Sequence, residues 1–270
     1  MLTIKNNIMA ENASRHLGQS YGALAKSVER LSSGLRINSA KDDAAGLAVR
    51  ELMRADIAVL RQGTRNANDG ISMLQTMEGA MATINNALIR MKELAEQAST
   101  GSYSDMQRNI MNNEFTEMAA EIDRIAGSTE FNSINLLNDA SGSATIHFGV
   151  GQEITVDGVD VTASALGISS SVSIDTAANA QSALATVHTA IENKDSARAM
   201  FGYMMNRLES TTEVLNIQTE NMMASESRIS DVDVSTEMAA LTRNQVLSQA
   251  GVSMLAQANM MPQMALSLLG

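Results

Sequence analysis

A long apolar stripe in the first half of the chain constrains the fold more than any other feature. From Ala44 to about Ser99, apolar residues recur at a spacing near 3.5, which keeps them on one side of an α-helix. At 1.5 Å per residue, an unbroken helix of this length would be roughly 80 Å long, so the stripe predicts a rod rather than a compact globule. The stripe consists of Ile57, Leu60, Ala67, Ile71, Leu74, Met77, Met81, Ile84, Leu88, Met91 and Leu94.

The residues before this stripe carry a second helical pattern. Apolar side chains alternate at spacings of four and three, which predicts one seam of a coiled coil. Gly34 predicts the end of that helix. Ser39-Ala40-Lys41-Asp42 predicts a new N-terminal cap, with Asp42 and Asp43 favourable in the first turn that follows. The seam consists of Leu17, Tyr21, Leu24, Val28, Leu31 and Leu35.

Composition favours long helices and excludes several functions. Aromatic residues make up only 3% of the chain, which has no Trp, one Pro and 20 Met, and Met is a good helix former. Because 30 acidic residues outnumber 19 basic ones, the net charge of −11 argues against nucleic-acid binding. The chain has no Cys, which excludes disulfides, Cys-ligated zinc and thiol catalysis.

The middle of the chain changes from a helical period to a strand-like one. Ser104-x-x-Gln107 is the pattern of a capping box that opens a helix. After Asn138 the apolar residues alternate with polar ones, and Asp157-Gly158 between β-branched residues predicts the turn of a β-hairpin. Helix returns from about Thr176, and after a break Ser235 is predicted to cap the last helix.

The last helix is informative because it has no charged face. From Asn244 to Gly270 no side chain is charged, yet Asn, Gln and Ser recur too often for a helix that spans a membrane. Two apolar stripes run along it, so it must be enclosed on more than one side. The N-terminal seam can cover one side, and other copies of the chain must cover the other. One stripe is Leu247, Gly251, Met254, Ala258, Met261, Ala265 and Leu268, and the other is Met238, Leu241, Val252, Leu255, Leu266 and Leu269.

No group of residues predicts catalysis or a cofactor. His16, His147 and His188 are isolated, and no two of them have a metal-binding spacing. Helix caps and a turn account for the carboxylate pairs, such as Asp42-Asp43. Methionines at helical spacing are typical of packing between helices rather than of a peptide-binding groove. We therefore expect a protein that is not an enzyme and has neither cofactor nor metal.

Segments at both ends carry the motifs of a known family. Residues 31–52 read LSSGLRINSAKDDAAGLAVREL, residues 65–82 read RNANDGISMLQTMEGAMA, and residues 226–269 begin ESRISDVDV. These segments resemble bacterial flagellin, and the resemblance extends up to about Asn138 and again from about Thr176. Larger flagellins carry extra outer domains in the middle, where this chain has only a hairpin region. The chain is thus similar to a minimal flagellin.

The resemblance implies the architecture. The fold class would be mainly α, with a long antiparallel helical rod and coiled coil formed by the N- and C-terminal halves and a short β-hairpin insertion. Residues 1–42 with 234–270 would form a terminal coiled-coil assembly domain. Residues 43–233 would form a rod-like helical domain with the hairpin region at 139–175. The filament-core interface is expected at Leu17, Tyr21, Leu24, Val28, Leu31, Leu35, Leu247, Met254, Leu255, Met261 and Leu268.

The function that the resemblance implies is that of a structural subunit, which polymerises into the bacterial flagellar filament for swimming motility. Family members are exported unfolded by the flagellar type III system, so the expected location is secreted and extracellular. The expected partners are further copies of the chain, the filament cap, hook-associated proteins and an export chaperone at the C-terminal helices. Neither nucleic acid nor membrane insertion is expected.

The resemblance also implies a surface patch that a receptor recognises, and two alternative functions remain open. Flagellins that activate the Toll-like receptor use a patch on two neighbouring helices, and Arg90, Leu94 and Glu114 occupy the matching positions here. From the residues alone, Leu94 can instead be a core residue and Arg90 a solvated charge. The alternatives are the hook–filament junction protein of the same family and a helical secretion-system tip or translocator protein.

Overall fold

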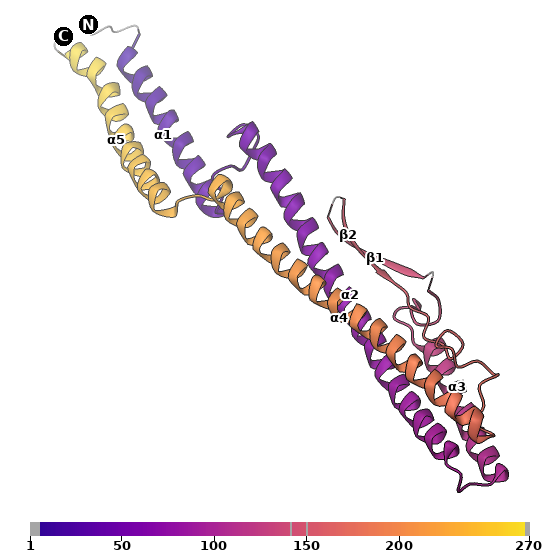
Figure 1. Ribbon diagram of the computed structural model, residues 1–270. Coiled ribbons are helices and arrows are strands. Elements are labelled where there is room, and N and C mark those ends of the chain that lie inside the picture. Colours follow the sequence, from indigo (N-terminus) through magenta and orange to yellow (C-terminus); the bar gives the residue numbers. More distant parts are fainter. Residues whose placement is uncertain (1–5, 141, 150, 268–270) are drawn as a thin grey trace. The chain divides into compact units, whose positions relative to one another are not determined.

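The computed structural model describes residues 6–140, 142–149 and 151–267 (Figure 1). Helices make up most of this part of the chain, and a single hairpin supplies the strands within it. The expected mainly α fold with a short β-hairpin is therefore confirmed. The elements are α1 (Ile8–Ser33), α2 (Ala44–Ser99), α3 (Asp105–Ser128), β1 (Ser143–Gly149), β2 (Gln152–Asp157), α4 (Ala177–Ser230) and α5 (Val234–Ser267).

The chain folds into two compact units, and the long helices α2 and α4 contribute to both. The first unit takes the chain up to Ile57 and again from Asn221 onward, so it holds α1, α5, the first part of α2 and the last part of α4. The second unit runs from Ala58 to Glu220 and holds α3, the hairpin and the remaining parts of α2 and α4. Segments from the two ends of the sequence thus fold together in the first unit.

The second unit has a continuous apolar core built from the predicted α2 stripe. Two polar contacts show how α2 pairs with α4: Lys194 Nζ donates to Asn85 Oδ1 at 2.7 Å, and Arg198 Nη2 lies 3.0 Å from Glu78 Oε1. The residue numbers rise on one helix as they fall on the other, so the two helices run antiparallel. The methionines of the stripe are packing residues, as expected. Core side chains include Leu74, Met77, Met81, Ile84, Leu88 and Met91 from α2, Phe115 and Ile122 from α3, and Val187, Phe201 and Leu208 from α4.

The predicted capping box is present at the start of α3. The Ser104 side chain accepts a hydrogen bond from the Gln107 N–H, and the Gln107 side chain accepts one from the Ser104 N–H. Gly34 ends α1 as predicted, with φ of 73° in the left-handed region that glycine adopts without a steric penalty. Local sequence chemistry therefore determines these two boundaries.

The N-terminal caps of two other helices differ from the predicted ones by one or two residues. Asp43, rather than the segment before it, caps α2, because its Oδ1 accepts from the Gly46 N–H at 2.9 Å. Asp42 lies outside the first turn of α2. The prediction that Ser235 caps the last helix is wrong, because Asp233 Oδ1 accepts from the N–H groups of Ser235 and Thr236 and α5 begins at Val234.

The predicted position of the hairpin turn is also wrong. Strands β1 and β2 pair antiparallel with Ser143 opposite Asp157, which places Asp157-Gly158 at the open end of the hairpin. The backbone after Asp157 does not fold back on β2, because Gly158 N–H donates to Gly142 O at 2.7 Å and Val159 N–H donates to Leu136 O at 2.8 Å. Gly151, which directly precedes β2, has φ of 71°. An Asp-Gly pair permits a turn but does not require one.

Candidate assembly surface

The two terminal helices form an antiparallel pair in the first unit. Near one end of α1, Asn7 Nδ2 donates to Ala258 O at 2.8 Å. Near the other end of α1, Arg30 Nη1 lies 3.4 Å from Glu237 Oε2. Pairing of early residues of α1 with late residues of α5 confirms the antiparallel association of the N- and C-terminal segments.

The seam of α1 uses only half of the predicted stripe. Leu17, Leu24 and Leu31 are partly buried, whereas Tyr21 and Val28 are 49% and 51% exposed. Small residues take the intervening seam positions, because a serine side chain allows the two backbones to approach more closely than a tyrosine does. Leu35 lies beyond the helix and pairs with Asp231 in an isolated β-bridge. The seam positions are Ala10, Ala13, Leu17, Ser20, Leu24, Ser27 and Leu31.

The seam of α5 combines residues from both predicted stripes. Gly251 faces Leu17, and a Cβ atom added at Gly251 would lie 3.1 Å from Leu17 Cδ1. Leu255 lies in the seam and Met261 is partly buried, whereas Leu247 and Met254 are exposed. The predicted interface residue Leu268 lies outside the described residues. The seam positions on this helix are Leu241, Asn244, Ser248, Gly251, Leu255 and Ala258.

Apolar side chains remain exposed on both helices after they have paired. The α1 side chains Tyr21 and Val28 lie on one flank of the seam, and Leu247 and Met254 of α5 lie on the opposite flank. Exposed apolar surface of this extent is typical of a surface that binds another protein. In the described part of α1 and α5, the large exposed apolar residues are Ile8, Met9, Tyr21, Val28, Val234, Met238, Val246, Leu247, Val252, Met254 and Met260.

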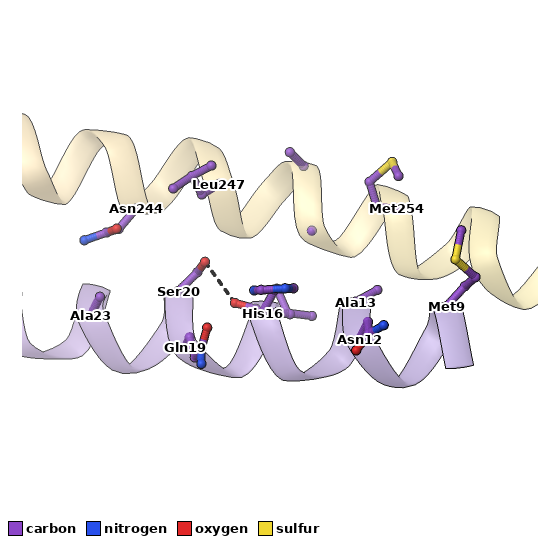
Figure 2. A pocket seen from close by; sticks show the side chains of 13 residues that line it. Met9, Asn12, Ala13, His16, Gln19, Ser20, Ala23, Asn244, Leu247 and Met254 are labelled. Atoms are coloured by element: carbon purple, nitrogen blue, oxygen red, sulfur yellow. Dashed lines mark hydrogen bonds between the residues drawn. The ribbon is translucent and has the colours of Figure 1, made fainter. Parts of the chain in front are cut away.

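A groove of about 640 Å³ runs between α1 and α5 on one side of the seam (Figure 2). None of the described residues that line it is acidic, Lys or Arg, and the Ser20 hydroxyl within it donates to His16 O of the preceding turn at 3.1 Å. The groove can therefore receive an apolar helix face without burying a charge. Its lining residues are Met9, Asn12, Ala13, His16, Leu17, Gln19, Ser20 and Ala23 from α1 and Asn244, Leu247, Ala250, Gly251 and Met254 from α5.

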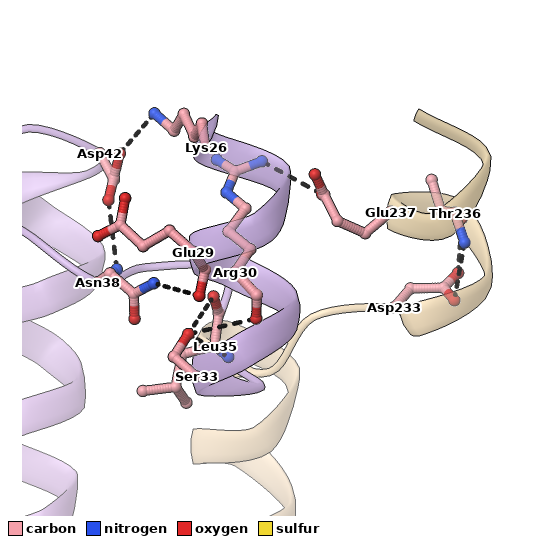
Figure 3. A network of polar contacts seen from close by, with 10 residues as sticks. All are labelled: Lys26, Glu29, Arg30, Ser33, Leu35, Asn38, Asp42, Asp233, Thr236 and Glu237. Carbon is pink, nitrogen blue, oxygen red and sulfur yellow. Dashed lines mark hydrogen bonds and ion pairs between the residues drawn. The ribbon is translucent and has the colours of Figure 1, made fainter. Parts of the chain in front are cut away.

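A polar network holds the other end of the helix pair, where α1 leads into the loop before α2 (Figure 3). Asp42 forms an ion pair with Lys26, and its Oδ2 accepts from the N–H groups of Asn38 and Ser39 at 3.3 and 3.1 Å. The Lys26 ammonium and these donors hold the pKa of the Asp42 carboxyl well below its usual value. A hydrogen bond from the Thr236 hydroxyl likewise lowers the pKa of Asp233.

We expect acid to weaken the first unit, and Asp42→Asn to remove part of this dependence. Because the folded-state pKa of Asp42 lies below its unfolded value, its carboxylate stabilises the fold above about pH 4 and loses that effect as the pH falls further. Thermal unfolding followed by circular dichroism from neutral to acidic pH measures the effect. Asp42→Asn should lower the midpoint at neutral pH by only a few degrees, because the Lys26 side chain is 46% exposed and solvent weakens the ion pair.

The matched control for this measurement is Asp56→Asn, which changes an exposed carboxylate in the same unit. It should leave the pH dependence of the midpoint as in the unchanged chain. If both variants showed the same pH dependence, Asp42 would have no special part in acid sensitivity.

The three residues of the expected receptor patch do not share one surface. Arg90 on α2 and Glu114 on α3 are exposed and form an ion pair at 2.8 Å, and the Glu114 carboxylate raises the pKa of the Arg90 guanidinium. Glu93 also pairs with Arg90, at 3.1 Å. Leu94 is only 1% exposed and belongs to the core of the second unit. A binding partner could therefore contact the charged pair but not Leu94.

The three histidines lie in different parts of the chain. His147 Nδ1 lies 3.3 Å from Glu153 Oε2, and His188 Nε2 lies 3.7 Å from Glu192 Oε1. His16 lines the groove between α1 and α5. Among residues 6–140, 142–149 and 151–267, no three His, Asp or Glu side chains lie together in a way that could hold a metal ion. Within these same ranges, no helix combines the length and apolar character that a membrane span requires.

Comparison with known proteins gives consistent matches at both ends of the chain. Residues 4–142 match the family model of the bacterial flagellin N-terminal helical region, and residues 184–269 match that of the C-terminal helical region. A flagellin of Halalkalibacterium halodurans is 42% identical over 99% of this chain and all of its own length. The flagellar filament 33 kDa core protein of Treponema phagedenis is 40% identical with the same coverage.

A solved structure agrees with these matches. The crystal structure of Bacillus cereus flagellin is 30% identical in sequence and superposes with a TM-score of 0.50. The match covers 60% of this chain and 94% of that one.

Proposed function

The chain belongs to the bacterial flagellin family, and we infer from this membership that it is a structural subunit of a flagellar filament. The observation that carries the inference is the apolar surface left exposed on α1 and α5 after these helices have paired. A subunit that polymerises buries such a surface against further copies of itself. Contacts between different patches of identical copies generate an open helical polymer when the rotation between copies does not close a ring.

The terminal segments would form the assembly domain, with two classes of residue. Leu17, Leu24 and Leu255 in the seam hold α1 to α5, so they act on assembly by shaping the pair. Exposed residues on either flank, such as Tyr21 and Met254, would contact neighbouring copies. Residues 1–42 with 234–270 would thus build the filament core, and residues 43–233 would surround it.

The remaining partners follow from family membership. We expect the subunit to be exported unfolded by the flagellar type III system and to form an extracellular filament used for swimming. An export chaperone would cover the exposed apolar side chains of α5 before assembly. The filament cap and hook-associated proteins would meet the subunit at the ends of the polymer. The family is structural, and we propose no enzymatic activity.

Negative-stain electron microscopy of the purified protein tests the proposal. After seeding with filament fragments or salting-out, the chain should form long regular filaments. A protein that stays monomeric under all such conditions would instead support a secretion-system tip or translocator function. The hook–filament junction alternative predicts few copies in sheared surface appendages, whereas a filament subunit should be their main component.

Receptor recognition is a second candidate function, supported by the exposed Arg90–Glu114 pair. Arg90→Ala should lower Toll-like receptor signalling by soluble monomer about tenfold, because a charged residue at the centre of an interface often contributes most of the affinity. Reporter cells provide the measurement. Arg124→Ala is the matched control, since Arg124 forms a comparable exposed pair with Glu121 on α3.

Equal signalling by the Arg90→Ala and Arg124→Ala proteins would contradict this assignment. Leu94→Ala is not a useful test of recognition. It would open a cavity in the core and cost about 2–5 kcal/mol of folding stability.

A further inference from the structure

Two methionines of the groove differ from the methionines of the core in their access to solvent. Met9 of α1 and Met254 of α5 are 63% and 64% exposed, and they lie near the same end of the groove, one on each helix (Figure 2). Met77, Met81 and Met91 of α2 are inaccessible within the core of the second unit. The same side chain therefore occurs in two environments with very different exposure.

Exposure decides whether a thioether reacts with peroxide. A sulfur lone pair attacks one peroxide oxygen, the sulfur–oxygen bond forms as the oxygen–oxygen bond breaks, and the departing hydroxide takes the proton of the sulfur-bound hydroxyl and leaves as water. The thioether is oxidised to a sulfoxide and hydrogen peroxide is reduced. The product replaces a flexible apolar side chain with a polar one. Met9 and Met254 meet the steric requirement, and the three core methionines do not.

We propose that Met9 and Met254 are oxidation sites at which hydrogen peroxide blocks the incorporation of a subunit into the polymer. This rests on the proposed function, because it requires the groove to be buried against a neighbouring copy. On α5, Leu247 and Ala250 line the groove beside Met254 and offer no side-chain hydrogen-bond donor, whereas α1 contributes Asn12, His16 and Gln19 to the lining. An apolar helix face of a neighbouring copy would offer no donor either. Burial of the sulfoxide against an apolar helix face is therefore unfavourable.

The proposal also determines when the sites react. Met9 and Met254 are accessible in the free subunit and would become inaccessible once neighbouring copies cover the groove. Oxidation thus acts on subunits before they assemble, and subunits that are already in a filament are protected.

The test compares three proteins before and after treatment of the monomers with hydrogen peroxide. In all three, Met238 and Met260, which are also exposed on α5, are replaced by Leu. The proteins are the otherwise unchanged chain, the double variant Met9→Leu/Met254→Leu, and the control Met106→Leu. Leucine keeps an apolar side chain of similar volume that cannot form a sulfoxide. Met106 is exposed but lies at the start of α3 in the second unit. Peptide mass spectrometry measures oxidation at each methionine, and the critical concentration of seeded polymerisation measures assembly.

After treatment, the unchanged chain and the Met106→Leu protein should both show a critical concentration raised about tenfold or more. The reason is that each contact between copies would have to bury two sulfoxides. The treated double variant should polymerise like the same variant before treatment. Filaments treated with peroxide should keep Met9 and Met254 reduced while Met106 is oxidised.

The proposal is overturned if the treated double variant loses assembly as much as the unchanged chain does. It is also overturned if treated unchanged chain, oxidised at Met9 and Met254, assembles normally. Failure of the untreated unchanged chain to polymerise is a separate outcome, which would overturn the proposed function itself.

Discussion

Removal of residues 1–42 and 234–270 should abolish polymerisation and leave the second unit folded. The described core residues of that unit lie between Ala67 and Leu215, outside the bounds of α1 and α5. The shortened chain keeps these core residues and loses all exposed apolar side chains of the helix pair. We expect cooperative thermal unfolding by circular dichroism and no filaments by electron microscopy, even at concentrations and with seeds that suffice for the full chain.

Two shorter truncations serve as controls. Removing only residues 1–42 leaves the seam of α5 without its partner, and removing only 234–270 does the same for α1. Each should prevent filaments as fully as the double truncation does. Filaments formed by the doubly truncated chain would mean that the second unit contains sufficient assembly contacts by itself. Loss of its cooperative unfolding would mean that this unit depends on the terminal helices.

A lysine in place of Met254 should prevent assembly without unfolding the subunit. Met254 lies on the flank of α5, outside the seam with α1, so a charged side chain there can remain in solvent in the monomer. In the filament the same ammonium group would be buried without a partner, at a cost of several kcal/mol for each contact. The critical concentration of seeded polymerisation should therefore rise by about a hundredfold or more.

Three further substitutions test whether the effect of Met254→Lys on assembly comes from the charge itself or from the position at which the charge is placed. Met106→Lys places the same charge on an exposed methionine of the second unit and should leave assembly unchanged. Met254→Leu keeps the apolar surface and should assemble normally. Leu255→Lys changes a seam residue, so it should disturb the α1–α5 pair as well as assembly. Normal filaments of the Met254→Lys protein would show that this flank of α5 is not an interface.

Much of the helical architecture follows from local patterns. The apolar stripe from Ala44 to Ser99 corresponds to α2 at both ends, and the Ser104-x-x-Gln107 motif begins α3 as predicted. Gly34 ends α1 because a glycine tolerates positive φ. These features depend on residues within a few positions of one another. A helical period and a cap are properties of one segment, and they need no distant partner.

The sequence predicted the boundaries of the helices better than it predicted which face of each helix packs against a neighbouring helix. The pattern of large apolar residues on α1 placed Tyr21 and Val28 in the seam, whereas the folded chain puts Ser20 and Ser27 there. Similarly, Arg90 and Leu94 are four residues apart on α2, yet one is exposed and the other lies in the core. A stripe of large side chains is broad enough to face more than one neighbour, so the closest approach of the partner helix selects the seam.

The sequence by itself determined the helices, most of their ends and the surplus of apolar surface at the two termini. Only the tertiary structure decided the turn of the hairpin, where the chain after Asp157 bonds to Leu136 and Gly142 rather than folding back on its own strand. It also decided that Gly251 faces Leu17, which leaves Met254 in solvent. Periods and caps arise within one segment, whereas burial depends on segments that are distant in the chain and brought together by folding.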